Sequence, residues 1–412
     1  MFEQPRSAIV VGAGMPGLAT AFFLQRHGVE VTVVDRRGVA AGSSWGNAGW
    51  LTPCFAVPLP EPSMLRTGLS KLFSPESPLS VSPALDPQLA RFLVQLASNC
   101  TRRRWRVSLA ALAALNREAL AAYDDIALDE PTRATDRFLI VFDDAAQRAH
   151  IVEELAEVRA AGQEVDYELL TGAQTRALDP ALTEEAGAGL RLAGQRYLDP
   201  GAYLAALAGR VRAQGGTVLE GTEVTDLADL GNAVAVRTAG GAELRADTAV
   251  LAAGAWLNPL ARRFGVRMPV QAGRGYSCSV SGATLPGGPT YFPARKAVCT
   301  PRGDRLRISG MMEFTGPDRP FDRRRMDAVL GSVRPMLRGV DFDDREDEWV
   351  GARPCTTDGL PLIGPTTSPR VHVCGGHNMW GIALGPVSGR LLADSIVTGR
   401  NRPELAPLHP LR

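Results

Sequence analysis

The sequence predicts an α/β protein in two parts: a Rossmann-type domain with a parallel sheet, discontinuous along the chain, and an interleaved α+β domain built on a mainly antiparallel sheet. Three observations lead to this prediction. The first 35 residues contain a strand, a glycine turn, a helix and a second strand. Two later strands, ending near residues 253 and 374, also run into glycine turns followed by helices. Residues 268–312 alternate in the manner of β-strands.

The first unit, SAIVVGAGMPGLATAFFLQRHGVEVTVVD, has the element order of a dinucleotide-binding βαβ motif. An apolar strand over residues 8–11 leads into Gly12, Gly14 and Gly17. Gly12 permits the tight turn, Gly14 lets the backbone approach a pyrophosphate, and Gly17 lets the helix pack closely on the sheet. The helix N-terminus then presents free N–H groups and a partial positive charge to phosphate groups.

Asp35 closes the second strand, at the distance from the glycines where an acid is expected to meet a ribose hydroxyl. Arg36 and Arg37 follow and are candidates for gripping the extra phosphate of NADP. The negative charge of Asp35 would repel that phosphate, which argues against NADP. The motif predicts a bound dinucleotide and does not distinguish FAD from NAD.

The segment after this unit is less regular. Residues 38–55 are rich in small and hydrogen-bonding side chains, and the prolines of residues 53–87 prevent long helices. Residues 88–125 have helical periodicity and predict two helices or one kinked helix. Four arginines surround Trp105 there: Arg102, Arg103, Arg104 and Arg106. They form either a solvated helix face or a patch for an anionic membrane surface.

The nucleotide-binding part then returns twice. A helix over residues 202–214 and a strand over 217–219 precede an apolar strand, residues 249–253, that ends at Gly254 and suits a central parallel strand. The last return is a strand at 371–374, a glycine-rich turn and a helix that runs to about residue 398. We therefore expect a nucleotide-binding domain over residues 1–60, 190–262 and 348–412, and a substrate domain over 61–189 and 263–347.

Composition limits the classes of function. A net charge of +1 removes the electrostatic argument for a nucleic-acid partner. The six cysteines form no CxxC pair or metal-ligand cluster, so we expect reduced thiols and no metal site. Without a signal peptide or a long uncharged apolar run, a cytoplasmic protein is expected, and peripheral contact with the inner face of the cell membrane stays open. The sequence indicates no oligomeric state.

Taken together, the motifs resemble those of the D-amino-acid oxidase and glycine oxidase superfamily, and most closely the bacterial FAD-dependent D-amino-acid dehydrogenases. The resemblance covers nearly the whole chain and rests on VVGAGMPGLATAFFLQRHGVEVTVVD, GSSWGNAGWLTP, LAAGAW, RGYS, GARPCTTDGLPLIG and GHNMWGIALGPVSGRLLAD. It implies a discontinuous FAD-binding domain and an active site where this domain meets the substrate domain. Because no Cys or His matches a site of covalent attachment, it implies non-covalent FAD.

The resemblance also implies the cofactor-binding residues. Gly12, Gly14, Gly17 and Asp35 correspond to the ADP-binding set, and the backbone of Val224 to an adenine contact. A loop and two later turns correspond to contacts with the pyrophosphate and flavin. With Arg36, these complete the candidate set: Ser43, Ser44, Asn47, Ala48, Gly49, Gly254, Trp256, Gly376, Met379, Trp380, Gly381 and Ile382.

Four residues are candidates for the substrate side. Arg353 matches the arginine that binds the substrate carboxylate in this family, and Tyr291 resembles a tyrosine that adds a hydroxyl to the same group. Tyr276 is either a strand aromatic or a wall of the active site. His377 is either a catalytic base or a residue that hydrogen-bonds backbone or faces the flavin passively. Arg274 is expected to brace the flavin or an acid.

The expected reaction is oxidative deamination of a D-amino acid, with hydride transfer from Cα to the flavin N5 atom and hydrolysis of the imino acid to a 2-oxo acid and ammonia. Arginine suits the carboxylate because its planar fork binds both oxygens. Electrons then leave to a quinone or another carrier. Alternatives are an oxidase that uses oxygen, a dehydrogenase for D-hydroxyproline or another cyclic imino acid, and a non-catalytic NAD-binding or sensory protein.

Overall fold

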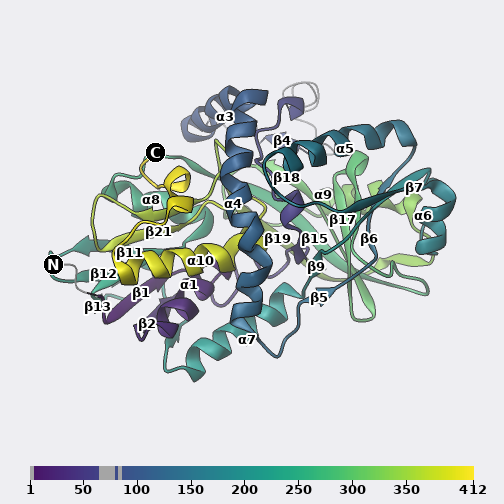
Figure 1. Ribbon diagram of the computed structural model, residues 1–412. Helices are drawn as coiled ribbons and strands as arrows, with labels where there is room; N and C mark the ends of the chain where they lie inside the picture. Colours follow the sequence, from purple (N-terminus) through teal and green to yellow (C-terminus); the bar gives the residue numbers. More distant parts are fainter. Residues whose placement is uncertain (1–3, 65–78, 82–85) are drawn as a thin grey trace.

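The computed structural model describes residues 4–64, 79–81 and 86–412, and its core lies around two large sheets. Figure 1 shows the N-terminal strands and the C-terminal helix side by side at one end, although they are distant in sequence. Many of the proline-rich residues of the 53–87 segment lie outside the described residues. In the described chain, no helix is long and apolar enough to span a membrane.

The first large sheet is the nucleotide-binding type that the glycine motif predicts. Its strands run parallel except for β20 at one edge. In spatial order they are β10 (Thr217–Leu219), β2 (Glu30–Val34), β1 (Ser7–Val11), β14 (Thr248–Leu251), β21 (Val371–Gly375) and β20 (Leu362–Pro365). Strands β2 and β10 lie on one side of β1, and β14 and β21 lie on its other side. The direction in which strands are added to the sheet therefore reverses at β1. A crevice at the carboxyl ends of the strands is expected at such a point.

Different layers cover the two faces of this sheet. Helices cover one face and share a buried core with β1 and β2: α1 (Met15–Arg26), α7 (Pro200–Ala213), α10 (Gly381–Thr398) and α4 (Arg102–Ile126). The other face packs against α8 (Leu257–Ala261) and a three-stranded antiparallel sheet of β11 (Val224–Asp229), β12 (Val234–Thr238) and β13 (Glu243–Ala246). The parallel strands are therefore buried on both sides, which explains their continuous apolar sequences.

The second large sheet is mainly antiparallel, as expected. Its strands follow the spatial order β19 (Val340–Thr356), β15 (Val270–Gly282), β18 (Arg305–Phe314), β17 (Ala297–Arg302), β16 (Thr290–Phe292), β6 (Phe138–Phe142), β8 (Ala188–Leu192) and β7 (Tyr167–Thr171). The short strand β4 (Leu79–Val81) pairs with β18. Helix α9 (Arg323–Val333) packs on β15, β17 and β18, while α5 (Ala145–Ala160) packs on β6 and β8.

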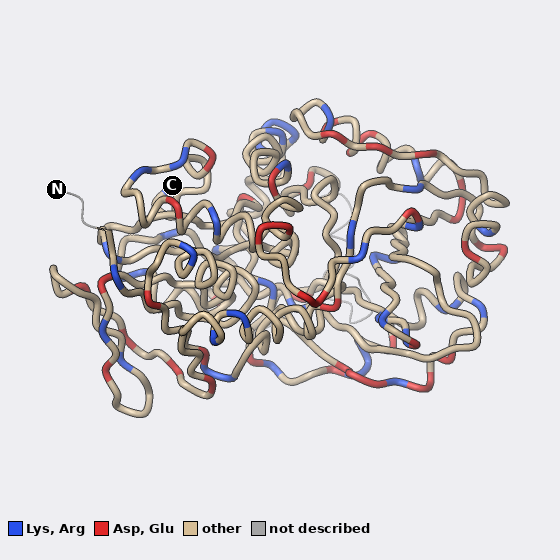
Figure 2. The backbone as a smooth tube through the Cα atoms, turned by 60° about the horizontal axis from the view of Figure 1, so that its bottom comes forward, with Lys and Arg blue, Asp and Glu red and all other residues tan. Residues whose placement is uncertain are grey.

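The remaining elements connect the two sheets. A small sheet joins β3 (Trp50–Leu51), β9 (Arg196–Tyr197) and β5 (Arg133–Ala134), and α6 (Gly172–Leu178) follows β7. The helical segment predicted over residues 88–125 is two helices, α3 (Pro87–Asn99) and α4, separated at Cys100. The Thr101 side chain accepts a hydrogen bond from the Arg104 N–H and so caps the start of α4. Figure 2 shows basic and acidic residues scattered over the whole backbone, in agreement with the near-neutral net charge.

Candidate active site

A cavity of about 400 Å³ lies at the carboxyl ends of the parallel strands. Val11 of β1, Ala252 just beyond β14 and Cys374 of β21 contribute to its lining. This is the crevice expected where the strand order reverses around β1. Its volume falls in the range of small-molecule and cofactor sites.

The glycine turn after β1 forms one wall of the cavity. Gly12 has a φ of +117°, and a Cβ there would lie 2.3 Å from the Ala252 carbonyl oxygen. Gly17 does not line the cavity; a Cβ at this position would lie 1.9 Å from the Gly12 carbonyl oxygen, so glycine is needed for the helix to approach the turn. Helix α1 has no side-chain cap at Gly14, which leaves N–H groups at its start for an anion.

Asp35 and its neighbours lie at the far end of the cavity. The Asp35 carboxylate accepts hydrogen bonds from the backbone N–H groups of Ala13 at 2.9 Å and Arg37 at 2.9 Å, which fix its position at the end of β2. Arg36 stacks on the ring of Trp256, with 3.9 Å between guanidinium carbon and ring centroid. Both side chains also bind Asp318, at 2.5 Å for Arg36 and 2.9 Å for the Trp256 indole N–H.

The pair Arg36 and Asp318 bears on the cofactor. Arg36 lines the cavity, but its charge is already matched by an acid. Arg37 also binds Asp318, at 3.3 Å. This arrangement, together with Asp35, gives neither arginine to a 2′-phosphate and agrees with the argument against NADP.

The small-residue loop after β2 forms the next part of the wall. Ser43, Ser44 and Asn47 line the cavity, and the Met15 N–H donates to the Ser44 hydroxyl at 3.4 Å. Two hydroxyls of the antiparallel sheet hold this loop, because Ser277 donates to the Gly46 carbonyl and Thr300 to the Ala48 carbonyl. Ala48 and Gly49 lie outside the main lining.

The turn before α10 forms another part of the wall, beside the start of α1. Met379, Gly381 and Ile382 line the cavity, and α10 begins there without a side-chain cap. The positive end of this helix therefore faces the cavity. Gly376 and Trp380 do not line it: Gly376 adopts a φ of +69°, and the Trp380 indole donates to the Val57 carbonyl at 2.8 Å.

Arg353 projects into the same cavity from β19, the edge strand of the antiparallel sheet. Its Nη1 donates to the Met311 carbonyl at 2.6 Å. Within the described part of the chain, no carboxylate lies within ion-pair distance of its guanidinium. Burial lowers the pKa of Arg353, because the charged form loses part of its solvation. Arg353 is thus a half-buried cation without an anionic partner in the described chain, and it lines a cavity where a ligand can supply the anion.

His377 lines the cavity but is held by α10. Its Nε2 lies 2.9 Å from the Ser388 hydroxyl, which itself donates to the Leu384 carbonyl. The Ser388 hydroxyl can therefore only accept from His377, so the imidazole carries a proton on Nε2. Nδ1 is buried and has no partner in the described chain. Burial lowers the pKa of His377 to about 3, which favours the passive role over catalysis.

The two candidate tyrosines lie outside the cavity lining. Tyr276 is buried in β15, and its hydroxyl donates to Glu313 at 2.9 Å. Arg274 pairs with the same carboxylate at 3.5 Å, so it braces an acid, as expected. Tyr291 packs with the rings of Trp50 and Phe55. Burial raises the pKa of both tyrosine hydroxyls, so they act as hydrogen-bonding groups only.

The structure brings most candidate residues to one cavity. Gly12, Gly14, Asp35, Arg36, Val224, Gly254 and Trp256 line it with the loop, turn and arginine described above. Several further lining residues were not among the sequence candidates: Thr222, Glu223, Thr225, Pro259, Pro354 and Asn378. They flank named positions in sequence, so proximity to the motifs was the available signal. The Met311 carbonyl had no signal, because a backbone contact depends on strand geometry.

The lining suits FAD better than a smaller ligand. It combines an acid placed for a ribose, the glycine turn at the uncapped start of α1 and the uncapped start of a second helix, α10. A nucleotide with a phosphate-linked second half matches both helix ends.

Comparison with known proteins agrees with this geometry. Residues 7–395 match the family described as FAD dependent oxidoreductase. A D-amino acid dehydrogenase of Rhizorhabdus wittichii is 33% identical over 96% of this chain and 97% of its own length. One of Methylobacterium radiotolerans is 32% identical over 97% of both chains.

Solved structures show the same fold at lower identity. Glycine oxidase of Geobacillus kaustophilus superposes with a TM-score of 0.72 at 22% identity and covers 100% of this chain and 99% of its own. L-alpha-glycerophosphate oxidase of Mycoplasma pneumoniae, with FAD bound, has a TM-score of 0.74 at 18% identity over 98% of this chain and 97% of its own.

Proposed function

The chain belongs to the family of FAD-dependent oxidoreductases, and from this premise we propose that it oxidises D-amino acids to 2-oxo acids and ammonia. The Cα–H bond breaks as the hydrogen leaves with its electron pair, and the amine becomes an imine. Water then adds to the imine and releases ammonia. The names of the curated relatives support the D-amino-acid substrate.

The observation that carries this proposal is Arg353. A half-buried guanidinium without an acid partner in the described chain is unfavourable unless a ligand supplies the anion. A carboxylate fits, because the planar fork can bind both oxygens and so fix the neighbouring α-carbon. An amino acid carries such a carboxylate next to the carbon that reacts.

Other residues of the chain hold FAD in this proposal. The start of α1 and the Gly12–Gly14 turn face its pyrophosphate, and Asp35 meets a ribose hydroxyl. The chemistry that bound FAD supplies is acceptance of a hydride at its N5 atom. The uncapped start of α10 places positive partial charge at the cavity, where it stabilises negative charge formed on reduction.

No strong base is required near Arg353 if the amine is neutral when it reacts. His377 is already a neutral donor to Ser388, and its lowered pKa makes it a poor proton acceptor at neutral pH. We assign it to holding the turn before α10. The role of Tyr291 as a second carboxylate ligand rests on the resemblance, since its ring packs beside Trp50 outside the cavity lining.

Anaerobic mixing of the FAD-loaded protein with D- and L-amino acids, cyclic imino acids and sarcosine tests the proposal through the visible flavin spectrum. We expect D-amino acids to bleach it. Arg353→Ala should bind FAD normally and lose bleaching, and Arg353→Lys should need at least about tenfold more substrate because lysine lacks the fork. A yellow wild-type protein that no member of the panel bleaches would show that the substrate class is wrong.

The electron acceptor is a separate part of the proposal. We assign the electrons to a quinone or another carrier, as the dehydrogenase names of the relatives suggest. Dye reduction measured beside peroxide formation distinguishes this from the oxidase alternative, which the similarity to glycine oxidase structures keeps under test. Peroxide at the full rate of turnover would overturn the assignment.

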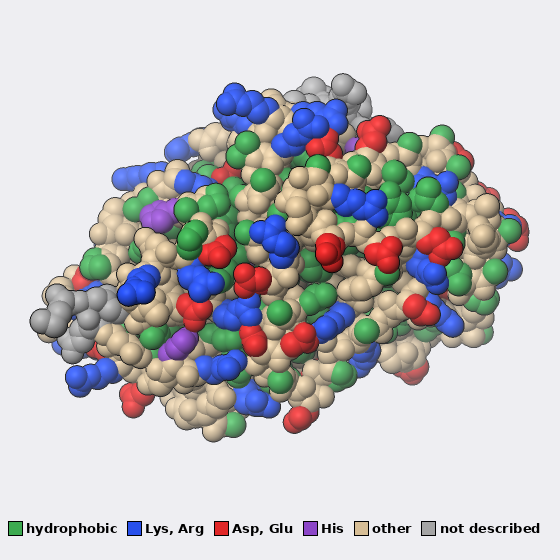
Figure 3. Space-filling view, viewed as in Figure 1, with side chains coloured by type: hydrophobic (Ala, Val, Ile, Leu, Met, Phe, Trp, Pro, Cys, Tyr) green, Lys and Arg blue, Asp and Glu red, His purple; other side chains and the backbone are tan. Residues whose placement is uncertain are grey.

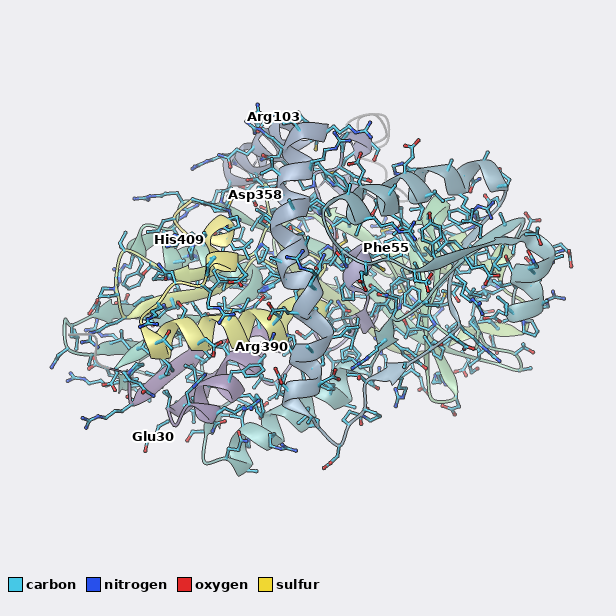
Figure 4. The ribbon with its side chains drawn as sticks, viewed as in Figure 1. Glu30, Phe55, Arg103, Asp358, Arg390 and His409 are labelled. Carbon is cyan, nitrogen blue, oxygen red and sulfur yellow. The ribbon has the colours of Figure 1, made fainter. Side chains whose placement is uncertain are left out.

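A membrane-facing surface at the start of α4 accompanies this acceptor. Basic side chains gather above α3 and α4 in Figure 3, and Figure 4 places Arg103 at this outer end. Val94 and Val107 are exposed nearby, while Arg102 and Arg106 share Glu157 at 2.6 Å. Because Glu157 offsets part of the positive charge, Arg103→Gln with Arg104→Gln is the informative variant. Unchanged sedimentation with anionic vesicles would remove the membrane from the proposal.

A further inference from the structure

A β-bulge lies beside Arg353, where β18 pairs with β15. Arg274 of β15 is paired with Glu313, and Tyr276 is paired with Gly310. Only Gly275 separates the paired residues of β15, whereas Met311 and Met312 separate those of β18. Met311 has a φ of +65°, in the left-handed region that residues other than glycine rarely adopt. Bulges of this kind turn backbone groups out of the ladder and are frequent beside active sites.

The Arg353 guanidinium lies over the single residue opposite the bulge. A Cβ at Gly275 would lie 2.1 Å from the Arg353 Nη2 atom, so the arginine occupies the space that a side chain would fill. Its Nη1 donates a hydrogen bond to the Met311 carbonyl at 2.6 Å and lies 3.9 Å from the Met312 sulfur. The bulge and the missing side chain at Gly275 therefore define where the guanidinium lies.

A buried network holds the bulge from the opposite side of the sheet. Nη1 of Arg325 lies 3.8 Å from the Met311 sulfur, and its guanidinium pairs with Glu313 at 3.1 Å. Glu313 also accepts from the Tyr276 hydroxyl at 2.9 Å and pairs with Arg274. These groups anchor Met311 itself and Glu313, the residue that follows the bulge. The left-handed residue is thus held by its surroundings, as strained residues at functional sites are.

We infer that the Met311–Met312 bulge positions Arg353 for the substrate carboxylate, with Met311 as a positioning residue; this deepens the proposed function and rests on it. A carbonyl orients the guanidinium through a hydrogen bond but carries no net charge. A carboxylate in its place would neutralise Arg353 and compete with the substrate. The carbonyl therefore fixes the direction of the fork and leaves its charge for the ligand.

Substitutions at Met311 separate the effect of its backbone conformation from the effect of its side chain. Asparagine and glycine accept the left-handed conformation, whereas valine, being β-branched, opposes it. We expect Met311→Asn and Met311→Gly to stay within about threefold of the wild-type dissociation constant for D-alanine, and Met311→Val to raise it about ten- to a hundredfold, the effect of a lost hydrogen bond to a charged group.

The measurement uses the FAD-loaded holoenzyme under anaerobic conditions. The dependence of the bleaching rate on D-alanine concentration gives the dissociation constant and the limiting rate separately, and acetate, titrated by the shift of the flavin spectrum, reports carboxylate binding without reaction. A positioning role predicts that Met311→Val changes affinity for both ligands in the same proportion. Equal affinities for the valine and glycine variants would overturn the inference.

The control is Met326→Val, which shortens another buried methionine of the same hydrophobic cluster, on α9 and not on the strand whose carbonyl binds Arg353. It should reduce thermal stability without changing the affinity for acetate. A matching loss of affinity in this control would also overturn the inference, because general loosening of the core would then explain the result. If no D-amino acid bleaches the wild-type flavin, the proposed function fails. The acetate affinities of the Met311 variants still test whether the bulge positions Arg353 for a carboxylate.

Discussion

Glu154 is a half-buried carboxyl group that titrates far from its ordinary range. It lies on α5 within a cluster formed with Glu61 and His150, whose ligand-type atoms are all within 4.8 Å of one another. Burial, with a smaller effect of the neighbouring Glu61, raises the pKa of Glu154 from 4.5 to about 8. Glu154 therefore keeps its proton at neutral pH.

This pKa predicts how stability depends on pH. The folded protein keeps the proton up to about pH 8, whereas the unfolded chain releases it near 4.5. Between these values the folded state binds more protons than the unfolded chain. The contribution of Glu154 to the free energy of unfolding therefore falls as pH rises, by at most about 1.4 kcal/mol per pH unit. Glu154→Gln should flatten this part of the curve of unfolding free energy, measured with urea between pH 5 and 8 as approximate limits.

Glu153→Gln is the matched control, because Glu153 is the exposed neighbour on the same helix. It removes one carboxyl group without touching the cluster. A slope unchanged in Glu154→Gln, or reduced equally in Glu153→Gln, would contradict the assignment of the proton to Glu154.

At the scale of single residues, the sequence predicted what sits in motifs. Gly12, Asp35 and Arg353 could be assigned because their spacing or surroundings repeat a known pattern, and the structure places each of them at the cavity. Tyr276 and Tyr291 could not be assigned in the same way. Whether a strand aromatic faces a cavity or a core depends on the neighbouring strands, and both rings lie outside the lining. Their roles toward the substrate stay predictions.

At the scale of elements, α1 and α10 cross at glycines and both begin at the cavity. A Cβ at Gly389 of α10 would lie 2.6 Å from the Thr20 N atom, and one at Gly385 would lie 2.7 Å from the Met15 Cγ. Because Thr20 N is a backbone atom, the helices would have to separate to accept a side chain. The close crossing thus sets the distance between the two helix ends that lie at the cavity.

Gly389→Ala is therefore expected to destabilise the protein by about 1–3 kcal/mol, as overpacking of a core does, and to weaken FAD binding. Urea unfolding of the apoprotein and FAD titration by fluorescence quenching measure these effects. Gly209→Ala on α7 is the control, since no atom lies within 4 Å of its added Cβ. This variant should be neutral or more stable by up to about 1 kcal/mol, because alanine favours the helix. Equal stabilities of the two variants would contradict the packing argument.

Element positions were predicted well where local sequence decides them. The strands of the parallel sheet and the helix ending at Thr398 agree with the expectations to within a few residues. The division between α3 and α4 was left open, although Thr101 is a recognisable cap. The bulge at Met311 could not be predicted, because an extra residue in a strand is defined only by its partner, and the GMM sequence gives no turn signal.

At the scale of the molecule, three separated stretches of chain build one sheet and one cavity. The repeated order of strand, glycine turn and helix made this arrangement predictable. The order of strands in the antiparallel sheet was not, because pairings such as that of β16 with β6 join segments about 150 residues apart by tertiary contact alone. The expected domain boundaries stay a prediction. They assign α4 to the substrate domain and α10 to the nucleotide-binding domain, yet these helices meet: Arg390 of α10 pairs with Glu118 of α4 at 2.6 Å and lies between the two helices in Figure 4.

FAD should join these stretches and stabilise the molecule as a whole. Its expected ligands come from both ends of the chain and from the middle, so only the folded state presents them together. A ligand that binds only the folded state at a hundred times its dissociation constant adds about 2.7 kcal/mol to the free energy of unfolding. The thermal unfolding temperature of the apoprotein should rise with added FAD and follow this concentration dependence.

ADP, which lacks the flavin half, should give a smaller rise at saturation because it reaches Asp35 but not the start of α10. An equal shift with ADP would mean that the flavin end of the cavity contributes nothing to cofactor binding, and would contradict the assignment of α10 and its preceding turn to the flavin.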